Sequence, residues 1–182
     1  MKTISRLFVL TSLLMMFAVA AQAQVTGSAS TEATIVAPIT ILNTVDLNFG
    51  NLAVSAVGGV VTLSPSDPAI RNQVGGVTFP VVIGTVTAAE FAVTGEPDGT
   101  YDITVPSTVV VITNTTGVGG ETMDVDNFTS ASDPPGAGVG EGLLDPSGVG
   151  VLFVGADVTV AAAQAAGVYQ SAADFDVTIN YN

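Results

Sequence analysis

The sequence predicts an all-β fold, an antiparallel β-sandwich of about ten short strands. Short runs in which apolar and polar residues alternate recur along the chain, as expected for strands with one dry face. Turn residues separate these runs about every eight to twelve residues. The only helix-like stretch, AAAQAA at residues 161–166, is long enough for little more than one turn, so no helix can connect parallel strands.

The first 23 residues have the pattern of a secretory signal peptide. Lys2 and Arg6 form a basic start, residues 7–21 are apolar, and Ala21-Gln22-Ala23 is a small-x-small cleavage site. The apolar run is shorter than the roughly 20 residues of a membrane-spanning helix, so we expect cleavage and no membrane span afterwards. The pattern is bacterial in style and predicts export to the periplasm, the cell surface or the medium.

Charge narrows the range of partners. Cleavage after Ala23 leaves 159 of the 182 residues, with Arg71 as the one basic residue against sixteen Asp and Glu, a formal charge of −15. Such a surface repels nucleic acid and anionic lipid, so neither is expected as a partner, and solubility outside the cell explains it. The chain has no cysteine for a disulfide, and no lysine after Lys2 for a lysine cross-link.

The exported chain is expected to hold an arm at residues 24–32 and a sandwich domain at residues 33–182. The residues of the arm are small and mostly polar. Val25, Gly27 and Ala29 alternate along it and would lie on one side of an extended strand. The arm is interpreted as a flexible lead-in, or as a strand that extends the sheet of a neighbouring molecule. The predicted strands of the domain are residues 33–41, 47–49, 60–63, 77–83, 90–94, 101–105, 109–113, 122–128, 149–154, 156–160 and 174–182.

Turn signals connect these strands. GEPDG at residues 95–99 predicts a hairpin between the alternating runs 90–94 and 101–105. Clusters of Pro, Gly, Asp and Asn predict loops at residues 64–76 and 129–142, and the second is expected to be a mobile or partner-facing surface. Nearly every aromatic residue after the signal peptide lies on a different predicted strand. We therefore expect these residues in the core rather than on a ligand-stacking surface.

The last nine residues, DFDVTINYN, alternate most strictly. Their apolar parity holds Phe175, Val177, Ile179 and Tyr181, and the other parity is entirely polar. Because a terminus normally frays, a strand this amphipathic must be held in a sheet, either its own or a neighbour's.

The side chains offer little catalytic chemistry. No histidine is present, which excludes Ser-His and Cys-His nucleophile pairs, and the carboxylates fall in turns or on polar strand faces. We therefore expect no enzyme activity and no cofactor. Calcium is the one plausible metal, with Glu121, Asp124 and Asp126 as weak candidates whose spacing matches no known ligand loop.

The domain resembles a family of exported bacterial proteins catalogued as domain of unknown function 4402. The segments that carry the resemblance are ATIVAPITI, LNFGNL, GGVVTL, FAVTGEPDGTYDITVPS, MDVDNFTS and FVGADVTVAAAQAAGVYQSAADFDVTINYN. This family brings no established activity.

The ending, with its penultimate Tyr181, is also similar to the last strand of chaperone-usher pilins and spore-coat-like fibre subunits. That likeness implies an incomplete immunoglobulin-like sandwich completed by a neighbour's arm, self-association into fibres, and a periplasmic chaperone as partner. The chain differs in lacking a disulfide, in placing its last glycine at Gly167, and in an arm, residues 24–32, without large apolar residues.

Two functions follow as hypotheses. The first is a non-enzymatic structural or adhesive subunit of a fimbrial-like or matrix-like assembly, built by strand pairing at a sheet edge. Phe175, Val177, Ile179 and Tyr181 would then form the groove wall, and Val25, Gly27 and Ala29 the donor face. The alternative is a self-contained extracellular module that binds carbohydrate or a host surface through residues 64–76 and 129–142.

Overall fold

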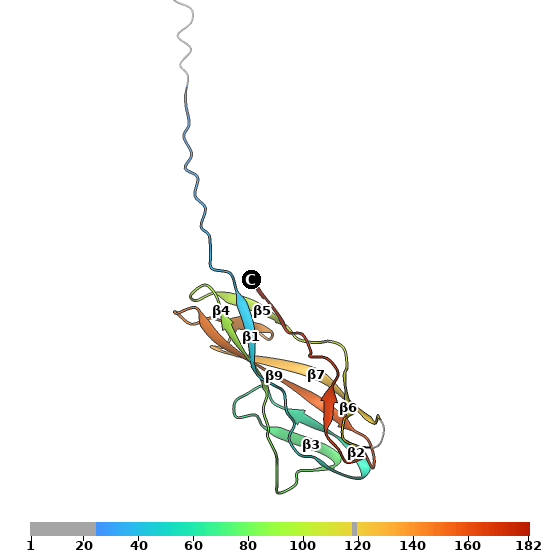
Figure 1. The fold of residues 1–182 in the computed structure, drawn as a ribbon. Helices are drawn as coiled ribbons and strands as arrows, with labels where there is room; N and C mark the ends of the chain where they lie inside the picture. Colours follow the sequence, from blue (N-terminus) through green and yellow to red (C-terminus); the bar gives the residue numbers. More distant parts are fainter. Residues whose placement is uncertain (1–24, 118–119) are drawn as a thin grey trace, which may run out of the picture. The chain divides into compact units, whose positions relative to one another are not determined.

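A computed structural model describes residues 25–117 and 120–182 (Figure 1). The chain divides into a segment that ends at Ile35 and a compact unit, Val36–Asn182, which contains all the assigned strands. The compact unit thus begins three residues after the predicted start at Ala33. The predicted signal peptide, residues 1–23, lies outside the described residues.

The predicted fold class is confirmed, because eleven strands pair in antiparallel sheets and the described residues contain no helix. Residues 161–166 form a turn instead of the helical turn that their alanines suggested. The strands are β1 (Thr40–Val45), β2 (Ala53–Leu63), β3 (Arg71–Thr78), β4 (Ala89–Thr94), β5 (Thr100–Thr104), β6 (Val110–Asn114), β7 (Thr122–Asp133), β8 (Glu141–Leu143), β9 (Val149–Val160), β10 (Tyr169–Ser171) and β11 (Thr178–Tyr181).

The larger sheet has eight strands and is organised around β9. Along the main path its order is β1-β4-β9-β7-β6-β10. One edge of β9 serves two partners in succession, β4 along residues 149–154 and β2 along residues 157–160, and β3 pairs with β2 alone. The other edge of β9 pairs with β7. A strand of twelve residues is long enough for both partners because each of them pairs with a different stretch of it.

The smaller sheet has the order β11-β5-β8. Consequently the predicted hairpin around residues 95–99 is wrong: β4 pairs with β1 and β9, whereas β5 pairs with β11 and β8. The turn residues bend the chain as expected, but the bend carries it from one sheet to the other. Local alternation shows that a strand has a dry face and not which strand lies beside it.

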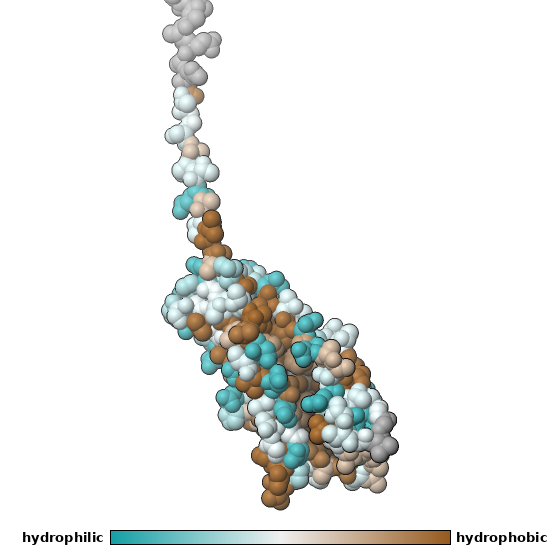
Figure 2. Space-filling model, in the orientation of Figure 1, coloured by the Kyte–Doolittle hydropathy of each residue, from teal (hydrophilic) through white to brown (hydrophobic). Residues whose placement is uncertain are grey.

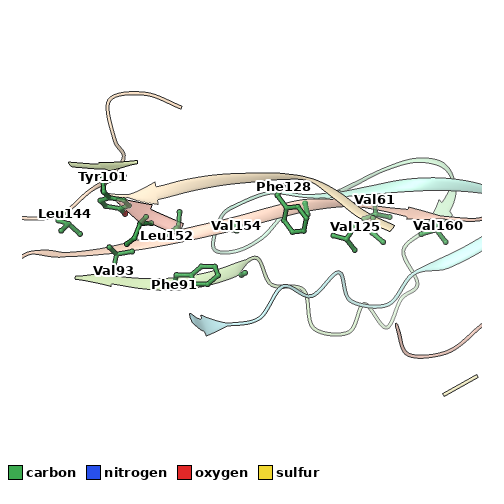
Figure 3. Close-up of a cluster of buried hydrophobic side chains, with 14 of the residues drawn as sticks. Val61, Phe91, Val93, Tyr101, Val125, Phe128, Leu144, Leu152, Val154 and Val160 are labelled. Atoms are coloured by element: carbon green, nitrogen blue, oxygen red, sulfur yellow. The ribbon is translucent and has the colours of Figure 1, made fainter. Parts of the chain in front are cut away.

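The core lies between the inner faces of the sheets. Figure 3 shows Tyr101, Leu144, Leu152 and Val93 gathered at one end of it, and Val125, Val61 and Val160 towards the other. The prediction that aromatic residues pack inward is confirmed for Phe91, Tyr101 and Phe128, which are buried, and the other aromatics among the described residues are partly buried. At about 25 cal/mol per Å² of apolar surface, this burial is the main source of stability in a chain without disulfides.

Parts of the two predicted loops, and one predicted break between strands, lie within strands of the structure. β3 starts at Arg71 inside the expected loop 64–76, and β7 continues to Asp133 inside the expected loop 129–142. Gly155 does not separate two strands but lies within β9, where an added Cβ would overlap the carbonyl oxygen of Leu63. Glycine is required there for close backbone approach, which in sequence is indistinguishable from a break.

Candidate functional site

β11 is an edge strand with one unpaired side. Its four residues pair antiparallel with β5, with Ile179 opposite Ile103 and Tyr181 opposite Tyr101. Within the described residues no second strand pairs with β11. The N–H and C=O groups on the outer side of this strand therefore have no ladder partner, and such an edge can accept another strand.

The predicted facing of the C-terminal residues is confirmed. Ile179 is 8% exposed, Phe175, Val177 and Tyr181 are partly buried, and the intervening polar residues are exposed. The ring of Phe175 packs at 5.0 Å from that of Phe128, at an angle of 45°. Only Thr178–Tyr181 is in the ladder, whereas residues 174–177 keep the alternation without strand partners.

The first strand of the domain, β1, is another edge strand, and β3, β8 and β10 likewise have a single partner strand each. β1 pairs with β4 and with no other strand of the described chain. Ile39 and Ile41 pack against the core but remain partly exposed, as do Leu47 and Phe49. Figure 2 shows apolar surface along the face on which β1 and the C-terminal segment run. The core is thus incompletely covered near the edges formed by β1 and β11.

Tyr181 has a second role that its sequence position did not reveal. Its hydroxyl accepts a hydrogen bond from the backbone N–H of Glu96 (2.6 Å) and donates one to the carbonyl of Ala37 (2.9 Å). The carboxylate of Glu96 in turn accepts from the backbone N–H of Ala37 (3.0 Å). These three bonds tie the start of the compact unit to the turn between β4 and β5 and to the last strand. No pattern in the sequence indicates that residues so far apart along the chain are in contact.

The arm is an extended segment without assigned structure. Residues 25–35 are exposed, form no strand and make no hydrogen bond among those of the described residues. Val25, Gly27 and Ala29, the predicted donor face, are all exposed. Ile35, 97% exposed, continues their parity. Because the compact unit begins only at Val36, the arm contains a large apolar residue that the predicted boundary had assigned to the domain.

The calcium candidates are not brought together. Asp124 is exposed and faces Thr159 across the β7–β9 ladder, whereas Asp126 faces Asp157. One oxygen of Glu121 is buried without a hydrogen-bond partner, but it does not join the two aspartates in a cluster. Among the described residues no group of three or more carboxylate, histidine or cysteine side chains could hold a metal ion.

Two shallow hollows lie on the compact unit. One, of about 410 Å³, opens between the segment after β5 and the segment before β11, and Val105, Pro106 and Phe175 are among its lining residues. The other, of about 260 Å³, is lined by Val36, Glu96, Gly99, Thr100, Tyr181 and Asn182. Neither hollow is lined by residues 64–76 or 129–142, on which the alternative hypothesis of a carbohydrate-binding module depends; that hypothesis stays a prediction.

The geometry defines a class of protein: an antiparallel β-sandwich whose last strand has a free edge. The described part of the chain contains no apolar helix of membrane-spanning length. The family described as Domain of unknown function (DUF4402) matches residues 39–181, so the chain belongs to this family, as its segments indicated. Comparison with curated proteins and with solved structures gives no match. The likeness to pilins stays a prediction.

Proposed function

We propose that this protein is a non-enzymatic, exported structural or adhesive subunit of a fimbrial-like or surface-matrix assembly. In this assembly the arm of one copy adds as a strand to the free edge of β11 in the next copy. The observation that carries the proposal is the combination of an unpaired edge on β11 with an exposed arm, residues 25–35, whose apolar residues alternate.

Strand addition uses groups that the described residues leave unpaired. Every second residue of a donated strand can exchange a pair of backbone hydrogen bonds with the edge, and these supply affinity without any particular side chain. The side chains set the register: a slip of one residue would turn Ala29 and Ile35 away from the core and bring serine and threonine in.

The partners follow from the same chemistry. A free edge beside partly exposed apolar side chains is prone to unspecific pairing during export, so we expect a periplasmic chaperone to cover it before a neighbouring copy does. The leader pattern of residues 1–23 supports export of this assembly to the periplasm, the cell surface or the medium.

Charge substitutions of opposite parity in the arm test the proposal. Ala29→Asp puts a charge on the donor face and should abolish detergent-resistant oligomers of the exported chain, because an unpaired buried charge costs several kcal/mol. The neighbouring Ser28→Asp adds the same charge on the outward face and should assemble normally. Gel electrophoresis without boiling and electron microscopy measure both. If the two variants behave alike, or if the wild-type chain stays monomeric, strand donation by this arm is wrong.

A further inference from the structure

The connection between β3 and β4 presents an apolar tip, defined as residues Val81, Val82 and Ile83. Their side chains are 101%, 74% and 53% exposed. The sequence had placed them in a strand that continued from Val77, but β3 ends at Thr78. Figure 2 shows the tip as an apolar protrusion at the lower end of the view. Three consecutive aliphatic side chains in water on a protruding turn mark an interaction site.

Hydrogen bonds from a neighbouring segment anchor the backbone of this apolar tip. The backbone N–H of Asn51 donates to the carbonyl of Ile83 (2.7 Å), and the Asn51 side-chain amide donates to the carbonyl of Val82 (3.0 Å). Arg71 stacks on the ring of Phe79 at 4.2 Å and donates to the carbonyl of Phe49 (2.6 Å). The only arginine of the exported chain is therefore used to fix this loop. A preorganised tip loses little entropy when it binds.

The compact unit offers a receptor for such a tip at its other end. The smaller hollow, called here the terminal hollow, lies where Val36, Tyr181 and the turn residue Gly99 meet, and holds about 260 Å³. β4 connects the two sites: the tip precedes its first residue, and the turn that lines the hollow follows its last. Tip and hollow thus lie at opposite ends of the domain.

Strand direction brings these two sites together in the proposed assembly. β11 runs towards the terminal hollow, since Tyr181 lines it. A donated arm that pairs antiparallel with β11 runs the other way, so the donor's own Val36 arrives at the tip end of the acceptor. The donor's terminal hollow is built beside that Val36. In this arrangement the tip of the acceptor and the hollow of the donor lie at the same junction between the two copies.

We propose that the apolar tip of one copy seats in the terminal hollow of a second copy, forming a head-to-tail contact alongside the donated strand. This inference rests on the proposed strand donation and names the second surface through which the same partner binds. Because the two surfaces differ and lie at opposite ends, the contact is heterologous, and each copy added to a growing chain exposes a new hollow or tip.

Cysteine pairing tests the contact directly, since the chain has no cysteine of its own. Exported chains carrying Val82→Cys are mixed with chains carrying Thr100→Cys under mild oxidation. A disulfide-linked dimer should form in the mixture and in neither chain alone. Val139→Cys is the matched control, because Val139 is a 106% exposed valine on another loop, and should give at least about tenfold less dimer with Thr100→Cys. Equal yields would overturn the inference.

Assembly measurements separate this contact from strand donation. Val82→Asp should raise the concentration needed for assembly at least about tenfold, whereas Val139→Asp should leave it unchanged. A synthetic peptide of residues 24–35 should bind both variants as it binds the wild type. If the peptide binds and Val82→Asp assembles like Val139→Asp, the head-to-tail contact is wrong and strand donation stands. If the peptide binds none of the chains, both proposals fail.

Discussion

At the scale of single residues, two tyrosines of the smaller sheet face each other in register and have opposite environments. Tyr101 is fully buried, and its hydroxyl has no hydrogen-bond partner among the described residues. Its ring lies over Gly142, where an added Cβ would overlap it. Burial raises the pKa of the Tyr101 hydroxyl above its usual 10.0. Tyr181, by contrast, uses its hydroxyl as both donor and acceptor.

Because of this difference, replacing each tyrosine by phenylalanine should change the free energy of unfolding in opposite directions. Tyr101→Phe removes a buried unpaired hydroxyl and should raise the free energy of unfolding by about 1 kcal/mol. Tyr181→Phe removes two hydrogen bonds and should lower it by about 1–2 kcal/mol. Urea unfolding followed by circular dichroism measures both changes. A stability loss in Tyr101→Phe would show that its hydroxyl has a partner.

At the scale of elements, β11 combines one paired side, one free side and one dry face. The face is buried by the core and the inner edge is paired with β5, so both are needed for folding. The outer edge is needed only for a partner. A substitution can therefore separate folding from assembly according to the direction in which the side chain points.

Ile179→Asp tests the dry face of β11. An unpaired charge at this position costs several kcal/mol, a large share of a domain stability of about 5–15 kcal/mol, so the variant should not be recovered folded. Thr178→Asp puts the same charge on the exposed face of the same strand and should change stability by no more than about 0.5 kcal/mol. Export yield and thermal unfolding compare the two. Normal melting of Ile179→Asp would contradict the facing seen here.

At the scale of the whole molecule, charge opposes the proposed assembly. In the proposed assembly, after removal of the predicted signal peptide, each copy carries a formal charge of −15, from one arginine and sixteen carboxylates, so copies repel one another. The attraction must come from backbone hydrogen bonds and apolar contact, neither of which salt screens strongly. Added salt should therefore weaken the repulsion between copies more than it weakens their attraction.

Salt should therefore promote assembly. Raising the ionic strength from 0.01 to 0.15 M shortens the Debye length from about 30 Å to about 8 Å and weakens the repulsion between copies. The concentration needed for assembly, measured by sedimentation, should fall over this range. If it rises, oppositely charged groups hold the copies together and the apolar contact proposed here is not the main attraction.

The sequence alone determined the class of the fold, the inward parity of residues 174–182 and the inward position of the aromatics. These follow from the period of two, because water excludes apolar side chains in the same way wherever a strand lies. The match to residues 39–181 agrees with the segments that suggested the family. Whether a side chain faces the core or the solvent within its own strand could thus be predicted from the sequence.

Only the tertiary structure decided which strands are neighbours. It separated β4 from β5, joined residues 149–160 into one strand, extended the arm to Ile35 and exposed the tip at Val81. The apolar side chains of a strand can pack against any apolar face. Its backbone N–H and C=O groups need a neighbouring strand, which can lie a hundred residues away in the sequence. The free edge of β11 and the bonds of Tyr181 depend on this long-range choice, so a local pattern carries no record of them.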